Sequence, residues 1–170
     1  MANKYLKNNG GVLTEEEAVA ASAGAGDAGK IPALDGGGRI DSTMMPVGIG
    51  ADTASITTSE DLAAGDIVDI YDVTGTATAR KADGASAGKY ATGFVLASTT
   101  SGSNATVYFE GQNNQLTGLT AGSRMYLSAT TPGAITATAP TGTGQVVQYV
   151  GRAISATAIA FEPAQPIVLA

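Results

Sequence analysis

The chain has 170 residues, which is enough for one ordinary domain with an additional segment and leaves little room for two full domains. Cysteine and histidine are absent, which excludes disulfides, cysteine–histidine zinc sites and proton transfer by histidine. Fifteen acidic and nine basic residues give a net charge of −6, so electrostatic binding to nucleic-acid phosphates is not expected.

The chain start carries no signal for export or membrane insertion. The sequence MANKYLKNNGG contains two lysines, but no apolar run of signal-peptide length follows it. A stretch of about 18 apolar residues, which a membrane-spanning helix needs, occurs nowhere in the sequence. We therefore expect neither a cleaved signal peptide nor a membrane partner.

The first element that the sequence predicts is a short helix. Thr14 and Glu17 have the spacing of a capping box, and two further glutamates would lie in the first helical turn. Alanines follow, and Gly24 and Gly26 would end the helix. We predict a helix over about residues 14–23. Because a helix of about ten residues is marginal in isolation, contacts outside it would have to hold it.

The next segment, residues 25–50, is rich in glycine and proline, which disfavours regular secondary structure. Apolar side chains nevertheless recur in GKIPALDGGGRIDSTMMP, residues 29–46. We name residues 1–50 the arm, and we expect these side chains to be buried on a neighbouring molecule and not in the core of the chain's own domain. The predicted contact residues are Tyr5, Lys30, Ile31, Pro32, Leu34, Arg39, Ile40, Met44, Met45 and Pro46.

From residue 51 onward the sequence predicts a β-domain that extends to residue 170. Short runs of Thr, Val, Ile and Tyr are divided by glycine-bearing turns, which is typical of a short-strand barrel or sandwich. In AGDIVDIYD the alternation puts Ile67 and Val68 on opposite faces of a strand. Further strands are predicted in NATVYFEG, SRMYLSAT, GQVVQYVGRAIS and TAIAFEP.

The β-domain contains an internal repeat with halves at about residues 62–111 and 119–163. Both halves begin Leu-x-Ala-Gly and continue as a strand, a turn and a second strand; GFVLAS is then matched by GRAIS, and ATVYFEG by ATAIAFEP. This alignment pairs Val107 with Ile159 and Phe109 with Phe161. Duplication predicts a core built from equivalent positions in the two halves. Chance similarity within a Thr/Ala/Gly-rich β-protein is the alternative.

Two patterns that contain aspartate raise the question of a metal site or a phosphate site. Asp66, Asp69 and Asp72 would alternate between the faces of a strand, so they cannot converge on one cation, and we interpret them as solvated or turn-capping residues. Asp35 precedes three glycines, but no Gly-Lys-Ser/Thr ending follows, so a flexible turn is the better interpretation. We expect no metal and no cofactor.

Glu110 and Glu162 fall at equivalent positions of the repeat and have the composition of a glycosidase carboxylate pair. Duplication explains the pair without catalysis. Aromatic residues, which usually line carbohydrate sites, make up only 5% of the chain. We expect that the protein is not an enzyme.

The arm and the repeat together resemble tailed-bacteriophage virion proteins. GKIPALDGGGRIDSTMMP resembles a Gly-Lys-Ile-x-x-Leu-Asp-x-x-Gly-Arg/Lys-Ile-Asp-x-x-x-x-Pro segment near the start of phage head-decoration and fibre-type proteins. The C-terminal region is similar to a module of such proteins, with a Gly-Leu-Thr-x-Gly opening, a Tyr-Leu-Ser turn and a Phe-Glu-Pro close. The resemblance covers residues 29–46 and about 62–170.

This resemblance implies a capsid decoration (cement) protein that binds the outer surface of a phage capsid and bridges subunits of the major capsid protein. It implies a virion protein made in the host bacterial cytoplasm and assembled as a homotrimer, with a homodimer as the alternative. Two other functions stay open at this point: a tail or head fibre base, and a carbohydrate-binding surface module.

Overall fold

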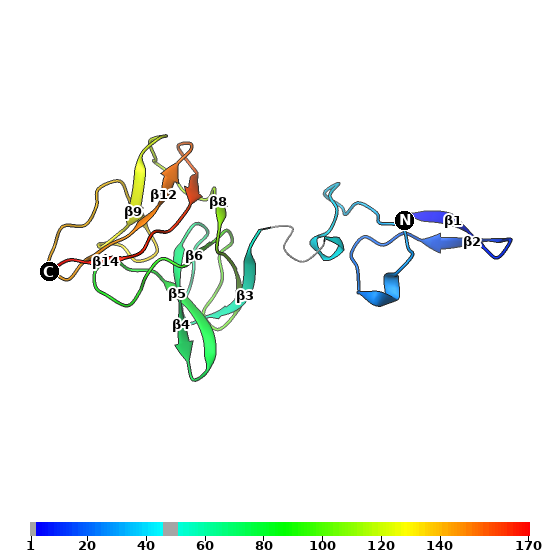
Figure 1. The fold of residues 1–170 in the computed structure, drawn as a ribbon, viewed down its shortest axis with the longest axis horizontal. Helices are drawn as coiled ribbons and strands as arrows, with labels where there is room; N and C mark the ends of the chain where they lie inside the picture. The colour runs from blue at the N-terminus through cyan, green and yellow to red at the C-terminus, as the bar shows by residue number, and fades with distance from the viewer. Residues whose placement is uncertain (1–2, 46–50) are drawn as a thin grey trace. The chain divides into compact units, whose positions relative to one another are not determined.

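The computed structural model describes residues 3–45 and 51–170. The chain divides into two units, residues 1–50 and 51–170 (Figure 1). Strands dominate the described residues, and the helical segments among them are two 3-10 turns of three residues each. The all-β class predicted from the sequence is therefore confirmed. Within the described residues, no helix has the length and apolar character needed to cross a bilayer.

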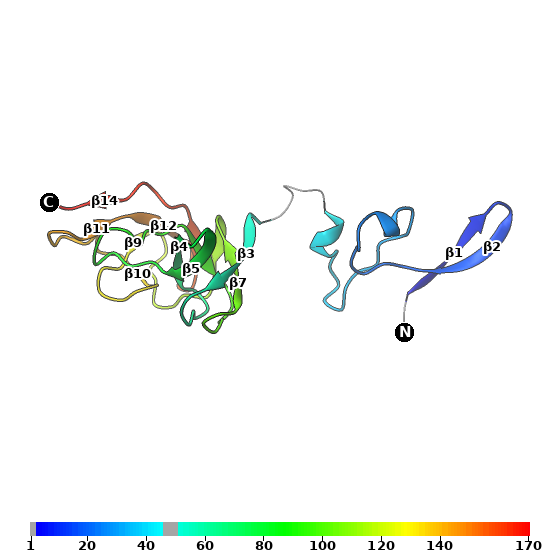
Figure 2. The same cartoon turned by 90° about the horizontal axis from the view of Figure 1, so that it is seen from below.

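The arm begins with a β-hairpin. Strand β1 (Lys4–Asn9) pairs antiparallel with β2 (Val12–Glu17), and Gly10 and Gly11 form the two-residue connection. Their φ angles, +64° and +94°, are those of the tight hairpin turns that glycine favours. The hairpin stands apart from the other segments of the arm for most of its length (Figure 2).

The predicted helix over residues 14–23 is wrong, because Thr14–Glu17 belong to β2. The glycine pair before this segment favours a reversal of the chain, and the reversal places the basic strand β1 beside the glutamates. Lys4 forms an ion pair with Glu15, and Lys7 Nζ lies 3.1 Å from Glu16 Oε2. These cross-strand pairs are available to a hairpin, whereas the helix would have had almost no apolar face to pack.

The described remainder of the arm, residues 18–45, is irregular, as its glycine and proline content predicts. It contains one 3-10 turn at Ala25–Asp27, a second at Ser42–Met44, and an isolated parallel bridge between Val19 and Pro32. None of the described residues 3–45 is buried. The arm therefore has backbone order without a hydrophobic core.

The β-domain begins with a closed five-stranded barrel. Its strand order is β3-β5-β4-β6-β7, and β3 closes the barrel by pairing antiparallel with β7 and parallel with β5. The strands are β3 (Thr53–Thr58), β4 (Ile67–Val73), β5 (Thr76–Lys81), β6 (Gly93–Val95) and β7 (Asn104–Tyr108). The barrel encloses a cluster of buried side chains: Ile56, Leu62, Val68, Ala79, Val95, Ala105 and Val107.

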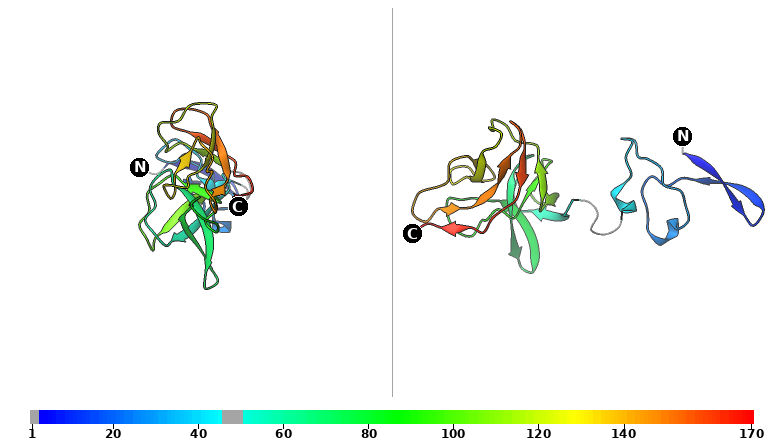
Figure 3. Two further views of the ribbon diagram at one scale, coloured as in Figure 1. Left: turned by 90° about the vertical axis from the view of Figure 1, so that its left-hand side faces the viewer. Right: turned by 45° about the horizontal axis from the view of Figure 1, so that its top comes forward.

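A second sheet packs against this barrel (Figure 3). Its order is β10-β9-β12-β13-β8, with β8 (Gly111–Asn113), β9 (Arg124–Leu127), β10 (Ile135–Thr136), β12 (Tyr149–Ala153) and β13 (Ile159–Phe161). Strands β11 (Val146–Val147) and β14 (Ile167–Val168) form a separate ribbon. Ile67 and Phe94 of the barrel join Leu127, Val150 and Ile159 of the second sheet in one buried cluster, which unites the two halves.

The two halves share one strand order. Strands β3, β4, β5, β6 and β7 correspond in that order to β8, β9, β10, β12 and β13. Val107 pairs with Val95 in the first half, and Ile159 pairs with Ala153 in the second, at the positions that the sequence repeat aligns. The halves differ in closure, because the described strands include no β8–β10 pair to match the pair formed by β3 and β5.

The repeated Leu-x-Ala-Gly opening has one structural role in both halves. Gly65 N–H donates to the carbonyl oxygen of Val95 at 2.8 Å, and Gly122 N–H donates to that of Ala153 at 2.8 Å. Both glycines have positive φ angles, +94° and +86°, which side chains rarely adopt. The opening therefore connects the start of each sequence repeat to the fourth strand of its half, β6 or β12.

Gly93 and Gly151 also occupy equivalent positions, at close approaches between strands. A Cβ at Gly93 would lie 2.8 Å from the carbonyl oxygen of Tyr108, and a Cβ at Gly151 would lie even closer to the carbonyl oxygen of Ala160. Both positions therefore require a residue without a side chain.

We predict that Gly151→Ala lowers the free energy of unfolding by about 3 kcal/mol, because the added methyl group forces β12 and β13 apart. Urea unfolding measures this change. Gly75→Ala is the matched control: Gly75 also has a positive φ, +87°, but open space around it, so a loss of about 1 kcal/mol is expected. Equal losses in the two variants would contradict the proposed collision.

Candidate functional site

The candidate site is the surface of the arm, where apolar side chains face solvent. Leu34 is 56% exposed, Ile40 54%, Ile31 51% and Met45 43%. A segment of this size with no buried side chain gains almost no hydrophobic free energy to offset the entropy lost on ordering. The arm therefore needs a second surface for stable order.

The other predicted contact residues differ in their exposure to solvent. Met44 and Lys30 are half-buried, whereas Pro32 and Arg39 are exposed. Pro46 lies outside the described residues. Val19, Lys30, Pro32 and Met44 line a shallow hollow, so the structure brings part of the predicted set together.

Aspartate side chains organise the loops that carry the apolar residues. Asp35 Oδ1 accepts hydrogen bonds from Gly37 N–H at 2.8 Å and from Arg39 N–H at 2.9 Å. Asp41 Oδ1 accepts from both the backbone N–H and the hydroxyl of Thr43. Side chains that bind nearby backbone groups in this way stabilise turns. Asp35 therefore shapes a turn, in agreement with the interpretation from sequence.

Long-range hydrogen bonds then link the turns to one another. Ser22 N–H donates to Thr43 Oγ1 at 2.8 Å, which joins positions 21 residues apart. Val19 N–H donates to Ile31 O at 3.0 Å, and Ala33 N–H donates to Val19 O at 2.7 Å. These bonds give the exposed apolar side chains a defined backbone framework.

Tyr5 was predicted to be free to contact a partner, but it already has a role inside the arm. It lies in β1, is half-buried, and its hydroxyl oxygen accepts a hydrogen bond from Ile31 N–H at 3.3 Å. Tyr5 thus connects the hairpin to the segment that begins at Lys30. A contact between Tyr5 and a partner stays a prediction.

Sequence reasoning missed three further exposed side chains in the hairpin: Leu6, Val12 and Leu13, which are 69%, 64% and 67% exposed. The signal was present, because two glycines lie between a lysine-bearing and a glutamate-bearing run. The capping-box spacing led to the helix interpretation instead.

Among the described residues of the arm, three ionisable groups have shifted pKa values. The Ala23 N–H and the Lys30 ammonium group lower the pKa of Asp27, and hydrogen bonds from Thr43 lower the pKa of Asp41. The hydrogen bond to Asp27, 3.0 Å long, raises the pKa of Lys30. The aspartates stabilise the folded arm above their ordinary pKa, 3.8, and this contribution is lost as the pH falls through their lowered values.

We predict that the amides of Ala23 and Thr43 lose protection from hydrogen exchange as the pH falls below about 4, because protonated Asp27 and Asp41 are weaker acceptors. NMR-detected exchange measures both amides. Asp41→Asn keeps an acceptor but cannot titrate, so Thr43 should lose its pH response while Ala23 keeps it. A Thr43 response unchanged by this substitution would contradict the assignment.

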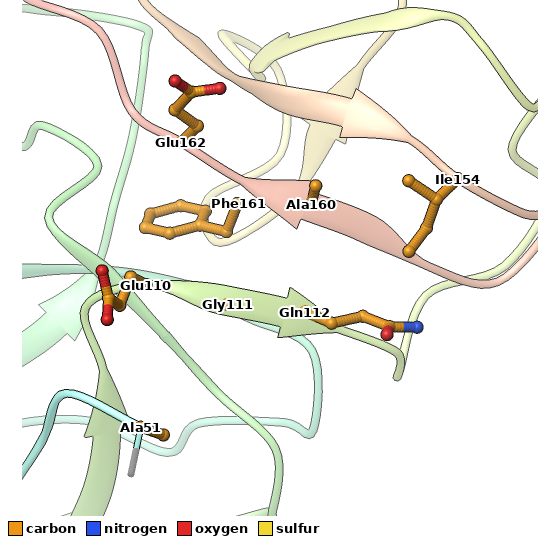
Figure 4. A pocket seen from close by; sticks show the side chains of 8 residues that line it. All are labelled: Ala51, Glu110, Gly111, Gln112, Ile154, Ala160, Phe161 and Glu162. Carbon is orange, nitrogen blue, oxygen red and sulfur yellow. The ribbon is translucent and has the colours of Figure 1, made fainter. Parts of the chain in front are cut away.

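The β-domain holds the carboxylate pair considered in the sequence. Glu110 and Glu162 border a shallow depression with Ile154 and Phe161. Both glutamates are exposed, and Figure 4 shows them on opposite sides of the Phe161 ring. Within the described residues, no group of three His, Cys, Asp or Glu side chains is arranged to hold a metal ion.

Comparison with protein-family models gives no match, and a search of curated proteins finds no relative of this chain.

Proposed function

We propose that the protein is a structural protein of a tailed-phage virion, which binds the outer surface of the capsid and stabilises the shell by bridging subunits of the major capsid protein. One observation carries the proposal: the segment from Lys30 to Met45 is organised by its own hydrogen bonds, yet it exposes its apolar side chains. A binding segment needs both an ordered backbone and exposed apolar side chains, whereas a segment of a folded core buries its apolar side chains.

The hydrogen-bonded turns favour binding by reducing its entropic cost. A disordered segment loses backbone and side-chain freedom when it binds, and this loss offsets part of the contact energy. Asp35 and Asp41 already restrict the loops that carry Leu34 and Ile40. The arm can therefore dock on a capsid groove with less reorganisation than an unstructured tail.

The charges of the segment fit the edge of an apolar contact. Arg39 is exposed beside Ile40, and its backbone is fixed by Asp35. Its guanidinium group is available to pair with acidic groups on the capsid at the rim of the interface, where charged groups favour correct orientation more than affinity. Lys30 is already paired with Asp27, so it contributes less to such a contact than the sequence predicted.

The β-domain is stabilised by its own hydrophobic clusters. Its two buried clusters are continuous with ordered strands, and within the described residues no buried side-chain nitrogen or oxygen lacks a partner. Such a domain does not need the arm for its own core. On a capsid lattice, several arms held by associated domains would bind many times more strongly than one, through their high effective concentration.

We predict that Leu34→Asp with Ile40→Asp weakens binding of the full-length chain to undecorated capsids by roughly a hundredfold, because two apolar side chains can no longer be buried. Co-sedimentation with capsids measures the binding. Val73→Asp is the matched control, since Val73 is a 40% exposed apolar residue of the β-domain, and it should leave binding unchanged.

Deletion of residues 1–50 tests the arm as a whole. The truncated chain should keep the circular dichroism of a folded β-domain, because both hydrophobic clusters lie within residues 51–170. It should not bind undecorated capsids. Full binding by the truncated chain, or equal binding by the Leu34/Ile40 variant and the Val73 control, would contradict the arm as the anchor.

A further inference from the structure

We propose that the β1–β2 hairpin is a contact between copies of this chain, in which β1 of one copy adds antiparallel to β2 of the next copy. This inference is independent of the capsid proposal, since it concerns a different part of the arm and a different partner. It assigns the hairpin to assembly of the protein and leaves the segment from Lys30 to Met45 for the capsid.

Within the described residues, both outer edges of the hairpin are unpaired. In the described part of the chain, β1 pairs with β2 alone and β2 with β1 alone. Ala18 N–H donates to Asn3 O at 2.8 Å, so alternate residues from Asn3 onward direct their backbone groups into the hairpin. The residues between them direct their backbone groups outward: Lys4, Leu6 and Asn8 on β1, and Leu13, Glu15 and Glu17 on β2.

The hairpin also lacks the additional strands or packed layer that would make it stable by itself. A two-stranded hairpin is at best marginally stable in water, and a sheet needs at least three strands or a packed layer. One face of this hairpin has half-buried side chains, including Tyr5, which contacts the rest of the arm. The opposite face carries Leu6 and Leu13, both exposed by about two thirds. Addition of strands at both edges supplies the missing pairing and places these leucines near those of neighbouring copies.

Charge decides which edges meet. The charged residues of β1 are Lys4 and Lys7, and those of β2 are Glu15, Glu16 and Glu17. Pairing two β1 edges would bring lysines together, and pairing two β2 edges would bring two runs of glutamate together, both of which are destabilising. Pairing β1 with the β2 of another copy instead repeats the lysine–glutamate contacts that already hold the hairpin.

This pairing also determines the symmetry. The two joined edges are different surfaces, so the contact is heterologous, and a joined pair of copies keeps one free β1 edge and one free β2 edge. A rotation axis parallel to the strands leaves every β1 running in one direction and every β2 in the other, so each added β1–β2 pair is antiparallel. When the rotation closes, the hairpins form a ring in which no strand edge is left unpaired.

The first test uses the full-length chain without capsids. Lys4→Glu places an acidic residue on the basic edge, and we expect the dissociation constant of the oligomer to rise roughly tenfold or more. Arg39→Glu changes the net charge equally but lies outside the hairpin, and association should be unchanged. Sedimentation velocity over a concentration series measures both. A monomeric wild-type chain, or equal association of wild type and Lys4→Glu, would overturn the proposal.

The second test is a charge exchange within one hairpin. Lys4 forms an ion pair with Glu15 across the hairpin, so Lys4→Glu with Glu15→Lys restores this pair with its charges reversed. This double variant should associate with itself as the wild type does, but it should form no mixed oligomers with wild type in native mass spectrometry, because like charges then meet at each mixed edge. Free mixing would overturn the edge-to-edge arrangement. Neither test involves the capsid, so failure here leaves the proposed function to its own experiment.

Discussion

The central constraint on this molecule is that its arm has hydrogen-bonded order without any buried side chain among residues 3–45. Hydrogen bonds alone contribute little net stability, because water offers competing partners in the unfolded chain. Hydrophobic burial normally supplies the difference, and here the apolar side chains remain on the surface. The described residues of the arm therefore do not supply the burial that would stabilise this order.

The β-domain satisfies the same constraint internally. Its repeat places Val68, Val95 and Val107 inside a closed barrel, while Ile67 and Phe94 point to the second sheet from the same strands. Both faces of the shared strands are thus buried. This explains why positions such as Gly93 and Gly151 accept no side chain: close approach of strands leaves no space for one.

The strands of the β-domain were predictable because alternating burial along each strand and turn residues between the strands leave clear patterns in the sequence. The alternation around Ile67 and Val68 gave their faces, and the aligned Val107 and Ile159 gave equivalent positions. The arm gave a weaker pattern. With no core to impose a period, capping-box spacing at Thr14 and Glu17 competed with the Gly10–Gly11 turn, and the cross-strand charges add to the turn in favouring the hairpin.

The candidate site was predictable in composition but not in internal organisation. Exposure of Ile31, Leu34 and Ile40 follows from a segment too rich in glycine and proline to form a core. The hydrogen bond from Ile31 N–H to the Tyr5 hydroxyl depends on a chain reversal that local sequence does not specify, whereas Asp27 and Lys30 are three residues apart and form a local ion pair. Contacts of Tyr5 and Lys30 with a partner stay predictions.

The two contacts proposed for the arm place different demands on the chain. Strand edges recognise another strand through backbone groups, so they tolerate many sequences and need charge to select a partner. The loops from Lys30 to Met45 present side chains instead, and their specificity depends on fixed turns such as that of Asp35. Because edge pairing and loop docking use different atoms, both can occur in one arm at the same time. Assembly through the hairpin would then raise the effective concentration of the loops and strengthen their binding without any additional contact.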